Sequence, residues 1–578
     1  MPASDRLTPT QNKAFARRMN RRRRADARFK IYGQAAVVMA LCLLVTLLVS
    51  IGLEARSAFT RHDLALDMHL SGTDSRTLYE DIRSDIIGRF DLSENRAGRI
   101  ELSEMVSRLA SGPISDQLEE TGVDMTRSYR VQVPLFDEGD LYLKGRSTDV
   151  ERSHMEANLI GETLLSGRFE RDLDRLHYWQ REQIEQLRRN ELMPAHRMFA
   201  GLTRQLANAP DDRSIRIRLE GAERRVRHLE SRIEDQEAAL LADELELNDQ
   251  MPTILLRLEN GWARAVSVSA DQIRFEWLLE GAEGHAQVMN MLLLSTPELQ
   301  RSISDIQIAA IETFRTNGNI RSVFNGNLFA NGDSSESEFA GVLSGMIGSI
   351  LIIIVTMALA VPVGIAAAVY LEEFAPRNAL TSFIQVNINN LAAVPSIVFG
   401  LLGAAIFVNG VVIPIPFVDQ ALTLGGGLGR GWPLVGGIVL ALMTMPTIII
   451  SSRAALASVP NSVRQAALAV GATRLQTINH HVLPIAAPGI LTGSIIGLAQ
   501  ALGETAPLLL IGMVAFIGEL PTGVTDRSTA LPVLIFQWST RAERAWEPMT
   551  SAAIIILLLL LLVLNAVAVW LRLRYEKR

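Results

Sequence analysis

A single carboxylate lies in a long apolar stretch toward the C-terminal end of the chain. Glu504 belongs to IIGLAQALGETAPLLLIGMVAF, residues 495–516, and no other charged residue lies within ten positions of it. A charge at membrane depth costs about 2.5 kcal/mol or more, so this side chain is expected to face a helix bundle or a water-filled path. Gly503 permits close helix approach. Pro507 lacks a backbone N–H and predicts a kinked, hydrated helix, in which Thr505 hydrogen-bonds back to the freed backbone.

A second group of polar residues lies in another apolar stretch. Asn387, Asn389 and Asn390 are followed by Ser396, and none of these side chains is charged. Neutral donors suit the transient passage of an anion, because tight binding would trap it. They equally suit contacts between helices, and both interpretations are open.

The apolar runs around these residues are long enough to cross a membrane. A hydrocarbon core of about 30 Å needs about 20 residues of helix. Pro395 and Pro446 interrupt the third and fourth runs. The predicted spans are 34–53, 339–370, 384–409, 432–450, 484–516 and 551–571.

The charge distribution predicts how these spans are oriented. The basic segment FARRMNRRRRADARFK directly precedes the first span, which favours a cytoplasmic anchor over a cleaved signal peptide or a nucleic-acid-binding arm. The 451–483 loop contains Arg453, Arg464 and Arg474 and no acidic residue, so it is expected in the cytoplasm. Six spans then place both the N-terminus and the C-terminus in the cytoplasm.

The predicted domains follow from this alternation. They are a basic cytoplasmic arm (1–33), a first transmembrane helix (34–53), a periplasmic domain (54–337), a five-span core (338–571) and a cytoplasmic tail (572–578).

The outside domain is predicted to be α+β. Residues 163–250 have a helical composition, and SYRVQVPLF and ARAVSVSADQIRFEWLL alternate as strands do. Residues 215–240 contain an apolar stripe at helical spacing, which favours packing within the domain over a dimeric coiled coil. The polar segment 324–338 is predicted to be a linker.

Several kinds of chemistry are not predicted. The only cysteine is Cys42, so an intramolecular disulfide is impossible. The histidines are scattered, so no metal site or other cofactor is expected. The sequence has no G-x-x-x-x-G-K-[ST] motif, so no P-loop is predicted to bind ATP.

The loop SSRAALASVPNSVRQAALAVGATRLQTINHHVLP, residues 451–484, is too long for a simple connection. Asn461 or Ser462 is predicted to cap a short helix that ends at Gly471. A second helix, TRLQTINHHVL, is predicted to stop at Pro484. Such a helix-turn-helix suits an element that a partner pushes, and a passive element at the membrane surface is the alternative.

The same loop resembles the coupling loop of ABC-importer permeases, which docks on an ATPase subunit. The matching residues are Gln465, Ala466, Ala467, Gly471, Leu483 and Pro484. Gln465 stands where that family usually has Glu, so any contact that needs this carboxylate is in doubt. The stretches AVPVGIAAAVYLEEFAP, NNLAAVPSIVFGLLG and AQALGETAPLLL resemble phosphate-importer permeases of the PstA type. This resemblance covers 339–571 and the first span, and the inserted domain resembles an extension of some proteobacterial members.

The resemblance implies a fold, a function and partners. The fold is an α-helical polytopic membrane protein of the inner membrane, with a type I ABC-importer permease core and an α+β periplasmic domain. The chain is expected to form half of an inorganic phosphate path and not to be an enzyme. The implied partners are a second related permease, two copies of an ABC ATPase, a periplasmic phosphate-binding protein and the lipid bilayer, but no nucleic acid.

The resemblance also gives the polar residues a role. The predicted path contains Glu504, Gln500, Thr505, Asn387, Asn390 and Ser396. The family often has Arg where this chain has Gln500, so Glu504 lacks an ion-pair partner one turn away. Glu504 is then expected to be a protonated donor, a partner for an arginine of another subunit or a gate, and a purely structural role is the alternative. A permease for another oxyanion and a membrane sensor remain rival functions.

Overall fold

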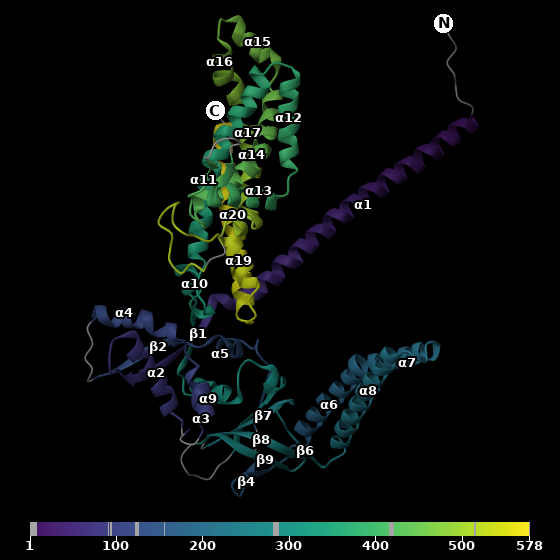
Figure 1. Ribbon diagram of the computed structural model, residues 1–578, viewed down its shortest axis with the longest axis vertical. Coiled ribbons are helices and arrows are strands. Elements are labelled where there is room, and N and C mark those ends of the chain that lie inside the picture. The colour runs from purple at the N-terminus through teal and green to yellow at the C-terminus, as the bar shows by residue number, and fades with distance from the viewer. Residues whose placement is uncertain are drawn as a thin grey trace. The chain divides into compact units, whose positions relative to one another are not determined.

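The computed structural model describes residues 9–90, 92, 95–121, 127–154, 157–259, 261–280, 288–414, 421–513 and 516–576. The chain divides into two compact units (Figure 1). Unit 2 is Arg61–Phe324, and unit 1 contains the segments before and after it. The predicted outside domain, 54–337, is therefore wider than the compact unit.

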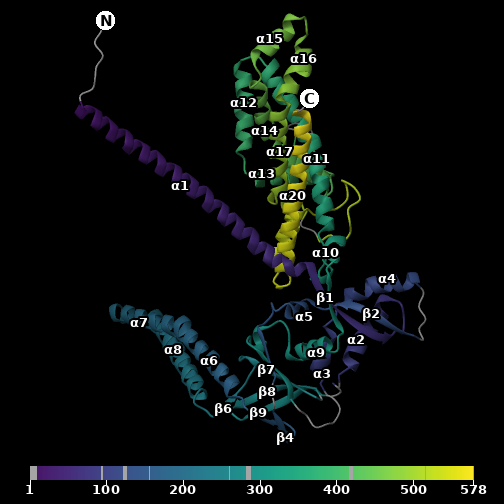
Figure 2. The same cartoon turned by 180° about the vertical axis from the view of Figure 1, so that it is seen from behind.

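Unit 1 contains the apolar helices. Within the described residues, five helical stretches are long and apolar enough to cross a membrane, and a sixth crossing results if one bent pair counts as a span. These helices are α1 (Pro9–Ala55), α11 (Leu343–Val369), α14 (Pro433–Ala457), α17 (Leu483–Gly503) and α20 (Trp546–Glu576), with the bent pair α12 (Ala379–Ala392) and α13 (Ser396–Gly403). The helices α11, α14, α17 and α20 lie side by side in both views (Figures 1 and 2).

The third predicted span, 384–409, is broken rather than continuous. The segments Ala379–Ala392 and Ser396–Asn409 meet at an angle of 98°. Pro395 has φ −56° and ψ 138°, which is extended backbone rather than helix. Proline also disfavours the helical conformation of the residue before it, and this explains why the break lies here.

The fifth predicted span, 484–516, ends earlier than expected. α17 stops at Gly503, because Glu504 is extended with φ −84° and ψ 115°. A separate short helix, α18 (Ala506–Leu510), begins beyond Thr505. The single kinked helix predicted around Pro507 is therefore wrong, and the chain forms two helices there.

The segment predicted as a linker, 324–338, packs inside unit 1. Leu328 and Ala340 are fully buried against Trp538 and Trp546. The indole N–H of Trp538 donates to the buried Asp333 carboxylate at 2.9 Å. Polar side chains of this segment thus form hydrogen bonds inside the unit, and the segment includes the short helix α10 (Asn327–Ala330).

The remaining elements of unit 1 are α19 (Leu531–Ser539) and a hairpin of β12 (Val411–Pro414) and β13 (Ala421–Leu424).

Unit 2 has the predicted α+β composition and is built on two antiparallel sheets. The smaller sheet has the order β11-β1-β2, from Ile320–Phe324, Thr60–His69 and Ser128–Pro134. Five helices accompany it: α2 (Ser75–Gly88), α3 (Arg96–Ser103), α4 (Ser111–Thr121), α5 (Asp137–Leu143) and α9 (Asp305–Thr316).

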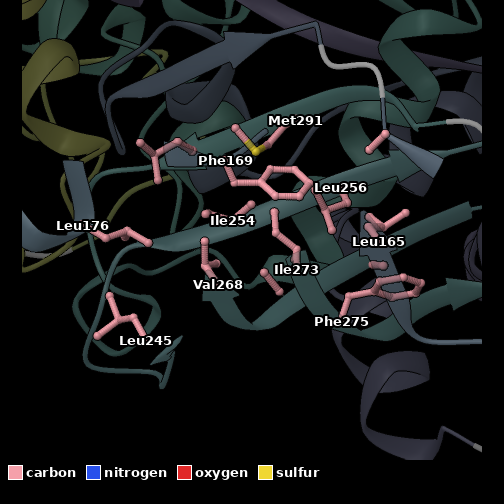
Figure 3. Close-up of a cluster of buried hydrophobic side chains, with 14 of the residues drawn as sticks. Leu165, Phe169, Leu176, Leu245, Ile254, Leu256, Val268, Ile273, Phe275 and Met291 are labelled. Carbon is pink, nitrogen blue, oxygen red and sulfur yellow. The ribbon is translucent and has the colours of Figure 1, made fainter. Parts of the chain in front are cut away.

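The larger sheet has eight strands and encloses a separate core. Phe169, Ile254, Ile273 and Phe275 are almost fully buried in this core (Figure 3). The order along the sheet is β3-β10-β7-β8-β9-β5-β4, and β6 pairs with β8. The strands are β3 (Val150–Ser153), β10 (Val288–Leu294), β7 (Thr253–Leu258), β8 (Gly261–Ser269), β9 (Gln272–Glu280), β5 (Leu164–Ser166), β4 (Asn158–Ile160) and β6 (Glu244–Glu246).

Unit 2 also has an arm of three further helices. These are α6 (Glu170–Leu187), α7 (Met193–Asn208) and α8 (Arg213–Ala239). Val226 and Leu229 of α8 pack against Ala195 of α7 and their neighbours. The predicted apolar stripe thus packs within its own domain.

Candidate functional site: the coupling loop and the polar residues of the helix bundle

The first helix of the loop after α14 is α15 (Asn461–Ala469). The predicted cap from Asn461 or Ser462 is absent, because Pro460 holds the capping position and no side chain bonds to the first turn. The predicted end is confirmed: Gly471 has φ +91°, a left-handed conformation that glycine adopts without strain.

The second helix of the loop does not stop at Pro484. Thr473 and Gln476 form a reciprocal capping box that starts α16 (Arg474–Thr477). The helix continues through a wider turn, Ile478–Val482, into α17. Pro484 lies directly after this wider turn, inside the continuous helical stretch, so its missing N–H does not end the helix. The loop is thus continuous with a membrane helix.

The residues of the predicted coupling motif face two ways. Gln465 and Ala466 are exposed, whereas Ala467 is buried. Leu468 is 46% exposed and Val470 is 85% exposed, so the helix also presents apolar side chains to its surroundings. Leu483 is half-buried and Pro484 is exposed at the start of α17. One face of α15 therefore packs against the rest of unit 1, and the other face is exposed and suits a partner.

Arg464 connects the buried face of α15 to two other helices. Its Nη2 donates to a Glu373 carboxylate oxygen at 2.6 Å, and its Nε donates to both oxygens of that group at 3.1 and 3.3 Å. Its Nη1 donates to the Val459 carbonyl at 2.6 Å, and Nη2 also donates to the Leu456 carbonyl at 2.9 Å. The side chains of Arg464 and Glu373 are only 18% and 11% exposed. Arg464 thereby ties α15 to the end of α11, to the Leu456 carbonyl in the last turn of α14 and to the Val459 carbonyl just beyond it.

A neighbouring ion pair joins the same two helices without α15. Arg453 of α14 lies 3.3 Å from Glu372, and both side chains are 27% exposed. Glu372 and Glu373 belong to a wider helical turn, Tyr370–Phe374, that ends α11. Sequence reasoning missed both acidic residues as partners of the loop, although YLEEFAP supplies two carboxylates beside a loop that carries only arginines.

Glu504 stands between α17 and α18 and is half-buried. Among the residues that the structure describes, its carboxylate has no hydrogen-bond or ion-pair partner. A Cβ added at Gly503 would meet nothing within 4 Å, so the close helix approach predicted there is not found. Thr505 contributes its backbone carbonyl to Leu509 at 3.1 Å, rather than bonding back into α17.

The other predicted path residues are spread over several helices. Gln500 of α17 accepts a hydrogen bond from Thr447 of α14 at 3.4 Å. Asn387 and Asn390 are exposed on α12, where the Asn387 amide donates to the Phe383 carbonyl at 2.8 Å. Ser396 opens α13 and is half-buried. The structure links Gln500 to a second helix, which sequence reasoning had not predicted, and no contact joins the asparagines to Glu504 among the described residues.

Comparison with known proteins agrees with the loop and the helix bundle. Residues 360–577 match the family described as "Binding-protein-dependent transport system inner membrane component", and residues 16–152 match a "Domain of unknown function (DUF3333)". The second match runs from α1 into unit 2.

Three curated relatives align with about two fifths of the chain. The probable ABC transporter permease protein YqgH of Bacillus subtilis is 34% identical over 39% of this chain and 70% of its own length. The phosphate transport system permease protein PstC 2 of Mycobacterium tuberculosis is 31% identical over 40% of this chain and 71% of its own. The phosphate transport system permease protein PstA of Yersinia pestis is 31% identical over 39% and 71%.

Proposed function

The chain belongs to the family of binding-protein-dependent inner membrane transport components, as an ABC transporter permease, and we propose that its substrate is inorganic phosphate. The observation that carries this substrate is the relationship to permeases named for phosphate transport, over the part of the chain that holds the helix bundle. The residues proposed for the path are compatible with it, because all of them except Glu504 are neutral.

We further propose that the chain acts as one of two permease subunits in the bacterial inner membrane. A binding protein would deliver phosphate from outside, and two ATPase subunits would drive the change of access. The free face of α15, with Gln465, Ala466 and Leu468, is the surface proposed to dock on the ATPase. The neutral Gln465 can still hydrogen-bond there, but it lacks the strength of a charge-assisted contact.

Movement of the loop would reach the bundle by two routes. The continuous helix from Arg474 to Gly503 carries it directly into the membrane. Arg464 carries it to α11 through Glu373 and to α14 through the Leu456 and Val459 carbonyls. A push on the loop would therefore act on α11, α14 and α17 together.

Glu504 is proposed to line the phosphate path at the break between α17 and α18. Its carboxylate has no protein partner among the described residues, so the charge would be balanced by protonation or by a group of the second permease. Gln500 lies one turn away and offers a neutral amide. A permease for another oxyanion is the alternative.

Uptake of radiolabelled phosphate tests this proposal in cells that lack the chain. The cells would carry wild type, Glu504→Gln or Glu504→Ala at matched membrane levels, with sulfate and molybdate as competing substrates. We expect wild type to restore phosphate uptake alone and Glu504→Ala to reduce it about tenfold or more, which is about 1.4 kcal/mol.

The Glu504→Gln variant separates the two forms of the side chain. Retained uptake indicates a protonated, hydrogen-bonding Glu504, whereas loss indicates that the ionised form is needed. Wild type that restores sulfate or molybdate uptake instead of phosphate uptake would contradict the substrate assignment.

A further inference from the structure

Unit 2 has two adjoining concavities where its helical arm meets the larger sheet, and the transport mechanism uses neither. The larger has a volume of about 600 Å³ and lies between α6, α8 and the chain around 246–251. The smaller has a volume of about 410 Å³ and is lined by α6, Pro252 and Leu293. Trp179 is half-buried and lines both, so the two concavities adjoin at this side chain, and together they are called the groove here.

The larger concavity is lined by side-chain amides. Gln183, Gln250 and Gln300 are among its lining residues, and none of their side chains bonds to another described residue. The indole N–H of Trp179 is equally without a partner in the described chain. Each amide offers two N–H donors and one carbonyl acceptor, so this wall is equipped to bond to groups that both donate and accept.

A pair of buried amides beside this wall lacks donors. Gln180 lines the larger concavity and is only 6% exposed, and its Nε2 donates to the Gln236 backbone carbonyl at 3.1 Å. The side-chain carbonyl oxygens of Gln180 and Gln236 are buried and have no hydrogen-bond partner among the described residues. These two oxygens lie below the accessible surface, so the amides of this wall that a ligand can reach are those of Gln183, Gln250 and Gln300.

The charges of the groove exclude a strongly ionic ligand. The smaller concavity has as many acidic as basic side chains, and Arg175 pairs with Glu151 at 2.7 Å. The larger has Arg232 against Asp235 and Glu246. A polyanion such as nucleic acid needs an excess of basic groups, which this groove lacks.

We propose that this groove binds a neutral glycan chain. A sugar ring has an apolar C–H face that packs on an aromatic ring, and Trp179 presents such a ring with a polar N–H at its edge. Sugar hydroxyls both donate and accept, which matches the accessible amides of Gln183, Gln250 and Gln300. The two concavities leave room for sugar units on either side of Trp179. This proposal concerns unit 2 and does not depend on phosphate as the transported substrate.

Calorimetric titration tests the proposal on the full chain in lipid nanodiscs, which contain no sugar detergent. The probes are two soluble oligosaccharides, a hexamer of β-linked N-acetylglucosamine and a hexamer of β-linked glucose, and an uncharged polar peptide of similar length. The variants are Trp179→Ala, Gln183→Ala and, as a matched amide control on α7, Gln205→Ala, which is exposed away from the groove. Thermal unfolding of each variant reports whether the fold is kept.

We expect at least one oligosaccharide to bind and Trp179→Ala to weaken its Kd about tenfold. Gln183→Ala weakens binding by a smaller factor, and Gln205→Ala leaves it unchanged. The proposal is overturned if neither oligosaccharide binds at millimolar concentration, or if binding is the same in wild type, Trp179→Ala and Gln183→Ala. Binding of the peptide but not of the sugars would also overturn it and would identify a peptide groove.

Discussion

Arg464 and Glu373 form the contact through which the proposed movement of the loop would reach α11. Glu373→Gln keeps the volume and one carbonyl acceptor but removes the charge from a pair that is mostly shielded from water. A charge-assisted hydrogen bond is worth about 1.5–3 kcal/mol against about 1 kcal/mol for a neutral one. We expect Glu373→Gln to reduce the phosphate transported per ATP hydrolysed about fivefold, measured with the reconstituted transporter in proteoliposomes.

Glu372→Gln is the matched control for that measurement. It removes a charge one position away, from a pair that is more exposed and does not contact α15. Its effect on the ratio should be within about twofold, because exposed pairs contribute only about 0–1 kcal/mol. Equal effects of the two substitutions would mean that the α15 link has no special part in coupling.

Glu312 in unit 2 gives a prediction about pH. Its carboxylate accepts hydrogen bonds from Tyr142 at 2.8 Å, Arg152 at 2.7 Å and Arg315 at 2.6 Å. Burial raises the pKa of Glu312, but the bonds from Arg152 and Tyr142 outweigh it and hold this pKa below its ordinary value. A carboxylate with a lowered pKa stabilises the fold above its unfolded pKa, and this stabilisation is lost as the pH falls through the folded pKa.

We therefore expect Glu312→Gln to destabilise unit 2 at pH 7 by about 2 kcal/mol, since it breaks a buried charged network. The difference from wild type should begin to shrink as the pH falls below the ordinary glutamate pKa of about 4.3, and it is lost as the pH passes through the lowered pKa of the folded carboxylate. Hydrogen exchange of α9 amides in the full chain measures this local stability. A difference that stays constant from pH 7 to pH 3 would show that the charge of Glu312 contributes nothing.

At the scale of elements, the length of the apolar runs predicted where membrane helices occur but not where they break. The runs around 339–370, 432–450 and 551–571 became α11, α14 and α20, because apolar length alone decides a span. Pro395 breaks its run, whereas Pro446 lies inside α14 and Pro484 opens α17. Local sequence does not distinguish these cases, since the outcome depends on which neighbours satisfy the freed carbonyls. The pairing of Arg464 with Glu373 was equally hidden, because the two lie 91 positions apart.

Close packing explains why α13 and α18 need a glycine at their contact. A Cβ added at Gly400 would lie 2.6 Å from the Cα of Pro507, which is backbone and cannot rotate away. We expect Gly400→Ala to destabilise unit 1 by about 1–3 kcal/mol and to lower its melting temperature in detergent. Gly503→Ala is the control, because its Cβ would meet nothing within 4 Å. A melting temperature that falls equally in both variants would contradict this explanation.

At the scale of the whole membrane unit, the contacts favour a sixth crossing by the bent pair. The ion pairs of Glu372 and Glu373 hold the end of α11 beside the end of α14 and the start of the coupling loop. The chain leaves α11 at this end and enters α14 at the other, so the bent pair α12 and α13 must traverse the bundle between them. The opposite end is joined by Asp333 and Trp538, and the Asp333 N–H donates to the Ile517 carbonyl at 3.2 Å. The buried Ala55 at the end of α1 packs in the same cluster.

This arrangement predicts on which side of the membrane each end lies. In a Cys42→Ala background, which lacks cysteine, Arg377→Cys marks the end with the coupling loop and Glu519→Cys marks the end with Asp333; both positions are exposed. We expect a membrane-impermeant thiol reagent to label Glu519→Cys in spheroplasts and Arg377→Cys only in inverted vesicles, because arginine-rich loops remain in the cytoplasm. Asp211→Cys in unit 2 should behave as Glu519→Cys does. If the reagent labels Arg377→Cys and Glu519→Cys from the same side, α12 and α13 do not cross the membrane. If all three positions are labelled from the side opposite to the one expected, the coupling loop is not in the cytoplasm.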